Sequence, residues 1–242
     1  MILQLLQERS TVTVQELTEQ LHSSESTIRR DLNTLDAQGR LIKIHGGAMA
    51  VGGEYRTQDA AFSAREDQNR AEKLRIAQYA ASLIRAHDFV YLDAGTSTAL
   101  MIDFITAQQV TFVTDAPTHA KRLVQRGFTT YVLGGELKLT TEALVGVDTV
   151  NALQKYNFTK GFFGTNAVNL HTGLSTPDIN EAEVKAQALL RCRERYVLAD
   201  PSKFHQISPV SFGKFGDATI LTTALNTPGY RNCKNIVEVD KL

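Results

Sequence analysis

A short turn rich in glycine and hydroxyl side chains is the first place where the sequence offers chemistry. It runs Asp93-Ala-Gly95-Thr96-Ser97-Thr98, between a predicted strand and a predicted helix. Such a turn presents O–H and backbone N–H donors to a phosphate, and the positive end of the helix dipole favours the anion. A tight turn with an N-capping side chain would have the same composition. The turn therefore indicates a phosphate site only together with the neighbouring loops.

A second candidate site lies near the N-terminus, where the segment from Ser24 to Leu35 has helical spacing. On a wheel of about 100° per residue, Ile28, Leu32 and Leu35 fall within about 60° of one another. The opposite face and its flanks carry hydroxyl, amide and guanidinium groups, from Ser26, Thr27, Arg29, Arg30 and Asn33. These groups read base edges and hold phosphates in a DNA major groove. A solvated surface helix is the alternative interpretation of the same face.

The elements around this helix favour a winged helix-turn-helix over residues 1–50. Val14, Leu17 and Leu21 have helical spacing, and a short break at His22-Ser23 precedes the second helix. Ser23 or Ser24 is a natural N-cap, which leaves backbone N–H groups near the helix start for a phosphate. The segment 40–47 alternates and ends in two glycines, which predicts a β-wing with Lys43 and His45 near its tip.

The rest of the chain is typical of an α/β domain with a parallel sheet. After Lys73, helical patterns alternate with short strands rich in Val, Ile, Tyr and Phe. We expect strands near 88–93, 110–114, 129–133, 158–163, 196–199, 218–222 and 236–239. Residues 51–72 have no clean periodicity and are predicted to be a linker, in part helical, so the sensing domain would span 73–242. Ligands of open α/β sheets bind beyond the carboxyl ends of the strands, where the glycine-containing loops gather.

Composition excludes several classes of protein. The 242 residues include 26 Lys+Arg and 26 Asp+Glu, with 43% hydrophobic residues, which is ordinary for a globular protein. The longest apolar stretches fall far short of the roughly 18 residues of a membrane span, and no basic leader precedes them, so a cytoplasmic location is expected. Cys192 and Cys233 are widely separated, without CxxC or paired histidines, which argues against a disulfide framework and a zinc site.

The N-terminal motif resembles a known family. Ser24-x-x-Thr27-Ile28-Arg29-Arg30-Asp31-Leu32, followed by Leu-Ile-Lys-Ile-His-Gly-Gly-Ala, is similar to the DNA-binding signature of DeoR-type bacterial transcriptional regulators. The family signature opens with an Arg that would lie ahead of Met1, so either the true start lies upstream or the first helix is short. The later loops resemble the effector domain of the same family, which is similar to ribose-5-phosphate isomerase. The resemblance covers about residues 1–240.

The resemblance implies a sugar-phosphate pocket in the C-terminal domain. It places Gly95, Thr96, Ser97 and Thr98 around the phosphate, Asp93 and the Thr114-Asp115 loop near the sugar, Gly134 and Gly135 on the same rim, and Lys185, Asp200 and Lys203 at the closure. The family more often has Thr-Asn where this chain has Thr114-Asp115. Lys203 follows a strand end and can supply a point charge to a phosphate. Glu181 and Lys185 are equally consistent with an ordinary i,i+4 helix pair.

Two functions follow. The first is a transcriptional repressor of a sugar-utilisation operon, released from operator double-stranded DNA by a phosphorylated sugar. Its loops resemble repressors of phosphotransferase-linked fructose or lactose operons, which favours fructose 1-phosphate and then tagatose 6-phosphate. The second is a sugar-phosphate isomerase or deaminase with an N-terminal appendage, with Glu136, Asp178, Glu181 or Glu183 as the base.

The helix-turn-helix decides for the regulator, because an enzyme has no use for it. We therefore expect no catalytic residue, no cofactor and no metal. Two DNA-binding domains on a near-palindromic operator predict a homo-oligomer, either a dimer or a tetramer.

Charge within the N-terminal region refines this expectation. Through Ala50 there are five basic and six acidic residues, a net charge of −1. Four of the five basic residues lie at or after Arg29, on the predicted reading helix and wing. We expect a small DNA-contacting face and few phosphate contacts per DNA-binding domain. Tight binding is then expected only when two such domains bind together.

Overall fold

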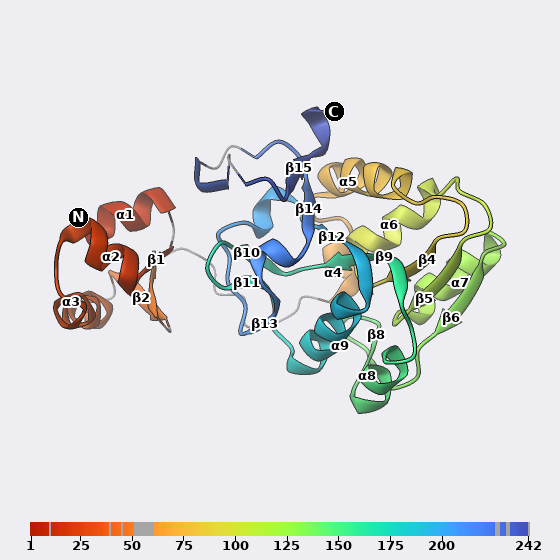
Figure 1. Ribbon diagram of the computed structural model, residues 1–242, viewed down its shortest axis with the longest axis horizontal. Coiled ribbons are helices and arrows are strands. Elements are labelled where there is room, and N and C mark those ends of the chain that lie inside the picture. The colour runs from red at the N-terminus through yellow and green to blue at the C-terminus, as the bar shows by residue number, and fades with distance from the viewer. Residues whose placement is uncertain are drawn as a thin grey trace.

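The computed structural model describes residues 1–9, 11–38, 40–44, 46–50, 61–225, 228–230 and 233–241. A small N-terminal head, residues 1–50, lies beside a larger α/β domain that begins at residue 61 (Figure 1). His45, one of the predicted DNA contacts, and residues 51–60 of the predicted linker lie outside the described residues.

The head consists of three helices and a three-stranded antiparallel sheet. The helices are α1 (Ile2–Arg9), α2 (Val14–Leu21) and α3 (Glu25–Ala37). The strands β1 (Thr11–Thr13), β2 (Leu41–Ile44) and β3 (Gly47–Ala50) form a sheet in the order β1-β3-β2. Leu6, Leu17, Ile28, Leu32 and Leu41 form the centre of its core. The predicted packing face of α3 is confirmed, because Ile28 and Leu32 are buried and Leu35 packs against this core.

A parallel sheet is the frame of the α/β domain. Its strands are β4 (Phe89–Leu92), β5 (Thr111–Thr114), β6 (Thr129–Val132), β9 (Phe158–Gly164), β12 (Cys192–Leu198), β14 (Thr219–Thr222) and β15 (Ile236–Glu238). Their order is β15-β14-β12-β9-β4-β5-β6, and each neighbouring pair is parallel. The sequence predicts all of these strands, with bounds that differ by at most one residue except at β12, which begins four residues earlier.

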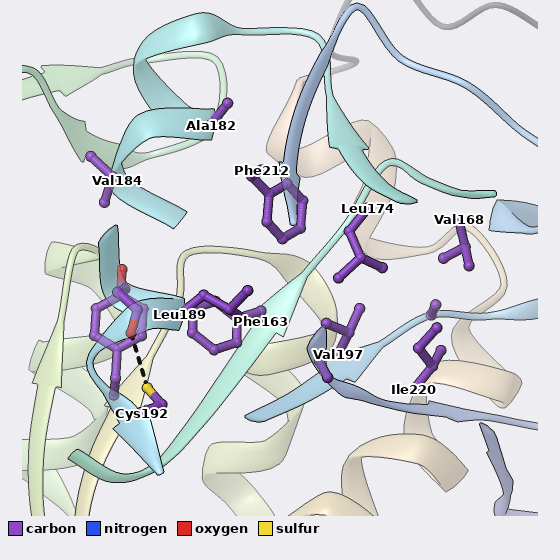
Figure 2. Close-up of a cluster of buried hydrophobic side chains, with 14 of the residues drawn as sticks. Phe163, Val168, Leu174, Ala182, Val184, Leu189, Cys192, Val197, Phe212 and Ile220 are labelled. Atoms are coloured by element: carbon purple, nitrogen blue, oxygen red, sulfur yellow. Dashed lines mark hydrogen bonds between the residues drawn. The ribbon is translucent and has the colours of Figure 1, made fainter. Parts of the chain in front are cut away.

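Helices cover both faces of this sheet. One face carries α5 (Arg70–Ser82), α6 (Thr96–Phe104) and α7 (Pro117–Gln125), whose apolar side chains pack against Val90, Leu92 and Phe112. The other face carries α8 (Val147–Leu153) and α9 (Ile179–Leu190). Figure 2 shows the core on this second side, where Phe163 and Val197 from the strands lie near Leu189 from α9. Alternate residues of each buried strand thus serve opposite cores, as expected for a covered parallel sheet.

Several short elements connect this frame, and most were not predicted. They are α4 (Phe62–Glu66), the hairpin β7 (Glu136–Lys138) and β8 (Ala143–Val145), the small sheet of β10 (Ala167–Asn169), β11 (Gly173–Thr176) and β13 (Val210–Gly213), and the 3-10 helices Pro201–Lys203, Phe215–Asp217, Pro228–Tyr230 and Val239–Lys241. The stretch from Gly173 to Thr176, where no strand was expected, is a buried strand. Its Ser175 and Thr176 are polar, so no apolar alternation marked it.

Both cysteines are free thiols. Among the described residues, no helix is long and apolar enough to cross a membrane.

Candidate functional site

A cavity opens at the carboxyl edge of the parallel sheet. It holds about 560 Å³ of space not filled by atoms, its open mouth included. Five of the residues predicted for the effector site line it: Gly95, Thr96, Ser97, Lys185 and Lys203. The lining also includes Glu181, a candidate base of the alternative enzyme, the strand-end loop 164–166, and two residues that were not predicted, Arg65 and Lys73. Strands β4, β9 and β12 all end here, which is why residues far apart in the sequence meet.

The first turn of α6 presents its backbone to this cavity. Gly95 is the N-cap, and no side chain caps the turn. Thr98 does not line the cavity; its Oγ1 donates to the carbonyl of Asp93 at 2.7 Å. The backbone N–H groups of the turn are therefore available to an anion, and the helix dipole favours its negative charge.

His119 of α7 supports the turn from behind. Its Nε2 lies 3.2 Å from the carbonyl oxygen of Gly95 and 3.2 Å from Oγ1 of Thr98. Because a carbonyl oxygen only accepts hydrogen bonds, the ring proton lies on Nε2. Burial lowers the pKa of His119 to about 4, so the ring is neutral at pH 7.

A buried ion pair joins β4 to α9 beside the cavity. Asp93 is fully buried and its Oδ2 contacts Nζ of Lys185. The same oxygen accepts a hydrogen bond from the backbone N–H of Gly164 at 2.8 Å. Burial acts to lower the pKa of Lys185, but the neighbouring carboxylates, Asp93 foremost, outweigh it and raise the pKa. Lys185 is therefore a protonated donor at the cavity wall, and Asp93 holds it in place.

Glu181 brings a carboxylate to the cavity, one turn before Lys185 on α9. Its Oε1 accepts hydrogen bonds from Nζ of Lys138 at 2.7 Å and from Oγ1 of Thr141 at 2.6 Å. Lys138 also pairs with Asp178, the N-cap of α9, at 3.2 Å. This network links the β7–β8 hairpin to the start of α9. Lys185 is thus held by Asp93 rather than by Glu181 as a simple helix pair.

The predicted Thr114-Asp115 loop supports the cavity without lining it. Oγ1 of Thr114 accepts from the N–H of Ala116, and Oδ1 of Asp115 accepts from the N–H of Ala94 at 2.8 Å. Asp115 is 3% exposed. Burial, then the charge of Asp93, raises the pKa of Asp115 to about 8. At pH 7 the side chain is therefore mainly a neutral carboxyl group that holds the turn leading into α6.

Asp200, Gly134 and Gly135 also lie outside the cavity lining. Oδ1 of Asp200 accepts from Nδ2 of Asn69 at 2.9 Å and from the N–H of Ser202 at 3.0 Å, which positions the 3-10 helix carrying Lys203. Gly134 and Gly135 connect β6 to β7. Gly135 has a φ of +134°, and a Cβ there would lie 2.0 Å from Oγ1 of Thr149, so only glycine fits this turn.

In the head, α3 exposes the face predicted to read DNA. The exposed residues are Ser24, Ser26, Thr27, Arg29, Arg30 and Asn33. Ser24 is the N-cap, and its Oγ accepts from the N–H of Thr27 at 3.2 Å. Arg29 pairs with Glu25 at 2.6 Å, whereas Arg30 has no side-chain partner among the described residues. Arg30 is therefore the guanidinium on this face that is most available to a ligand.

The wing continues this face. Strands β2 and β3 form the predicted antiparallel hairpin. Nζ of Lys43 donates to Oδ1 of Asn33 at 2.6 Å, and the N–H of Lys43 donates to Asp36 at 2.9 Å. Helix α3 and the wing thus present one polar surface, as a winged helix-turn-helix requires to bind a major groove and its flank.

The spacing of apolar residues around Lys73 could have predicted that this lysine is buried. Lys73, Ile76, Ala77 and Ala80 have the i, i+3, i+4, i+7 spacing of a buried helix face, and all four are buried. A lysine at the head of an apolar stripe must find polar partners inside the protein. Arg65 carried no such signal, because α4 lies in the segment predicted as linker.

Comparison with known proteins assigns the family. Residues 68–224 match the DeoR C terminal sensor domain, and residues 1–52 match the DeoR-like helix-turn-helix domain. The chain belongs to the DeoR family. The α/β domain of this DeoR-family protein is therefore a sensor domain, and its head is the DNA-binding domain of the family.

Curated relatives match over most of their length. The chain is 40% identical over 244 residues to the uncharacterized HTH-type transcriptional regulator FruR of Bacillus subtilis, covering 100% of this chain and 96% of FruR. It is 33% identical to the lactose phosphotransferase system repressor of Staphylococcus aureus, covering 90% of this chain and 87% of that repressor. Ribose 5-phosphate isomerase A from Methanocaldococcus jannaschii shares 19% identity with a TM-score of 0.43, covering 57% of this chain and 55% of the isomerase. A structural likeness of that size says nothing about chemistry.

Proposed function

We propose that this DeoR-family protein represses a sugar-utilisation operon and is released from operator DNA by a phosphorylated sugar. Fructose 1-phosphate is the favoured effector, and tagatose 6-phosphate is the second candidate. The names of two relatives, FruR and the lactose phosphotransferase system repressor, support this choice of sugars. The protein acts as a homo-oligomer, because two heads must meet two half-sites of a near-palindromic operator.

The observation that carries the proposal is the composition of the cavity. It combines an uncapped helix N-terminus, four cationic side chains, and further hydrogen-bonding groups at Glu181 and the loop 164–166. Cations and backbone N–H groups bind a phosphate, whereas carboxylate, amide and hydroxyl groups bind sugar hydroxyls. A phosphorylated sugar satisfies both parts of this lining at once.

The mechanism proposed is a shift between two arrangements of the heads. A sugar phosphate that binds better to the arrangement unable to reach both half-sites lowers operator affinity. The alternative function, a sugar-phosphate isomerase or deaminase, keeps one supporting observation: Glu181 places a carboxylate at the cavity. Turnover of a pentose or hexose phosphate by the purified protein would establish that alternative.

Two substitutions separate the proposed roles of the domains. Arg30→Ala is expected to lower operator affinity about tenfold or more, because an arginine contact to DNA is worth about 1–3 kcal/mol. Effector affinity should stay unchanged. Lys203→Ala should weaken effector binding about tenfold, the value of one charge-assisted hydrogen bond, and leave effector-free operator binding intact.

Fluorescence anisotropy with the upstream region of the chain's own gene, with and without each sugar phosphate, measures both effects. Lys121→Ala removes an exposed cation from α7 and serves as the matched control. The induction mechanism is wrong if no sugar phosphate changes operator affinity of the wild-type protein.

A further inference from the structure

Helix α4 is attached to the rim of the cavity at two points. The N–H of Phe62, at the start of α4, donates to the carbonyl of Thr140 at 2.9 Å. Near the end of α4, the carbonyl of Arg65 accepts a hydrogen bond from Nζ of Lys73. α4 is the first helix that the structure describes after the head, so it lies on the connection between the two domains.

Arg65 brings a guanidinium from α4 into the cavity lining. Its Nε is buried and has no hydrogen-bond partner among the described atoms. A buried donor without a partner costs free energy, so a ligand that accepts its hydrogen bond would be stabilised by this position. The planar guanidinium suits the oxygens of a phosphate group.

Positive charge exceeds negative charge at this end of the cavity. Arg65, Lys73 and Lys203 all line it, and no ion pair within the described residues involves Arg65 or Lys73. Asp200 is the carboxylate that favours the charged form of Lys73, but its Oδ1 already accepts from Asn69 and Ser202. Burial, then the charge of Lys203, lowers the pKa of Lys73 to about 8. An anion would neutralise this cluster.

We propose that α4 is a ligand-dependent strap: Arg65 and Lys73 bind the phosphate of the effector from one side, and the first turn of α6 binds it from the other. Binding then fixes α4 on the sensor domain, because the side chain of Arg65 contacts the phosphate while the carbonyl of Arg65 accepts a hydrogen bond from Nζ of Lys73. The strap gives the effector a direct mechanical connection to the chain segment that leads to the head. This inference rests on the proposed function for the identity of the ligand.

Hydrogen exchange of the full-length protein tests the strap, with inorganic phosphate and fructose 1-phosphate as separate probes. Each probe should slow the exchange of backbone amides in residues 61–66 of the wild-type protein. Arg65→Gln should abolish this slowing and weaken the affinity for fructose 1-phosphate about tenfold, the value of one charge-assisted hydrogen bond. Arg70→Gln removes the same charge from an exposed position outside the cavity lining and should change the affinity less than about threefold.

Arg65→Lys provides a second variant that keeps the positive charge and loses the planar guanidinium. Its affinity for fructose 1-phosphate should lie between those of the wild type and Arg65→Gln. The strap is overturned if Arg65→Gln binds and slows exchange like the wild type, or if neither probe slows exchange in α4 of the wild type. Should the probes protect α4 while no sugar phosphate alters operator affinity, the strap stands and the proposed function fails. Should sugar phosphates release the operator equally in the wild type and Arg65→Gln, the function stands and the strap fails.

Discussion

At the scale of single residues, Asp115 shows how a departure from a family pattern is tolerated. The family more often has asparagine at this position, and a neutral carboxyl group offers the same accepting oxygen as an amide. The oxygen is used, since Oδ1 accepts from the N–H of Ala94. Burial and the neighbouring Asp93 keep the side chain protonated at neutral pH, because they raise its pKa to about 8. In this fold the protonated carboxyl group of Asp115 therefore fills the structural role of an asparagine amide.

Replacing Asp115 with asparagine should stabilise the sensor domain at alkaline pH. The folded pKa, about 8, lies above the ordinary aspartate pKa of 3.8, so the folded state holds a proton that the unfolded state releases. This group's contribution to stability therefore falls as pH rises from about 4 to 8, by up to about 1.4 kcal/mol per pH unit. Asp115→Asn removes that loss, and urea unfolding at pH 7 and pH 8 should show the stability gain over wild type growing with pH.

His119 titrates in a lower pH range, so it does not interfere with this experiment. Its folded pKa, about 4, lies below 6.5, so its effect is a loss of stability as pH falls below 6.5 and is absent between pH 7 and 8. Asp148→Asn, on an exposed residue of α8, should show no gain that depends on pH. A constant difference between Asp115→Asn and the wild type from pH 7 to 8 would mean that Asp115 is already ionised.

At the scale of elements, what the sequence predicted depended on the pattern of neighbouring elements. The strands of the parallel sheet were predicted because they alternate with helical patterns, although β4, β5, β6, β14 and β15 have only three or four residues each. Strands β1, β7, β8, β10, β11 and β13 are equally short, lie outside this alternation and were missed. Their pairing is decided by tertiary contacts, as at Ser175 and Thr176, whose burial in a small sheet no local pattern encodes. The same limit hid Arg65, because a five-residue helix inside a polar segment has no detectable period.

The N-cap of α3 yields a prediction that separates folding from DNA contact. Ser24→Ala removes the acceptor for the N–H of Thr27 and should destabilise the head by about 1 kcal/mol. Ser24→Asp keeps a good capping side chain, so the head should remain as stable as the wild type. A carboxylate at this position repels a DNA phosphate, so operator affinity should nevertheless fall. Urea unfolding and anisotropy measure the two effects, and unchanged DNA binding by Ser24→Asp would remove the start of α3 from the interface.

At the scale of the whole molecule, two routes connect the cavity with the head. One is the proposed strap. The other is β10, which directly follows the cavity loop 164–166 and ends at Asn169. Nδ2 of Asn169 donates to Oγ1 of Thr11 in the head at 3.4 Å. His171, two residues later, lies 3.6 Å from Glu16, which also closes the capping box at the start of α2. The turn after β10 therefore contacts α2, the helix that precedes α3.

His171→Ala measures how much of the coupling uses this second route. The His171 and Glu16 side chains are 35% and 32% exposed, and a pair in such a setting is worth about 1 kcal/mol or less. The ratio of operator affinities without and with fructose 1-phosphate should therefore change by up to about fivefold. The affinity for the sugar phosphate itself, measured in the absence of DNA, should stay near the wild-type value. His87→Ala alters another exposed histidine of the sensor domain and should leave the ratio unchanged. If His171→Ala also leaves it unchanged while Arg65→Gln abolishes release, coupling runs through α4 and the contact at β10 only orients the head.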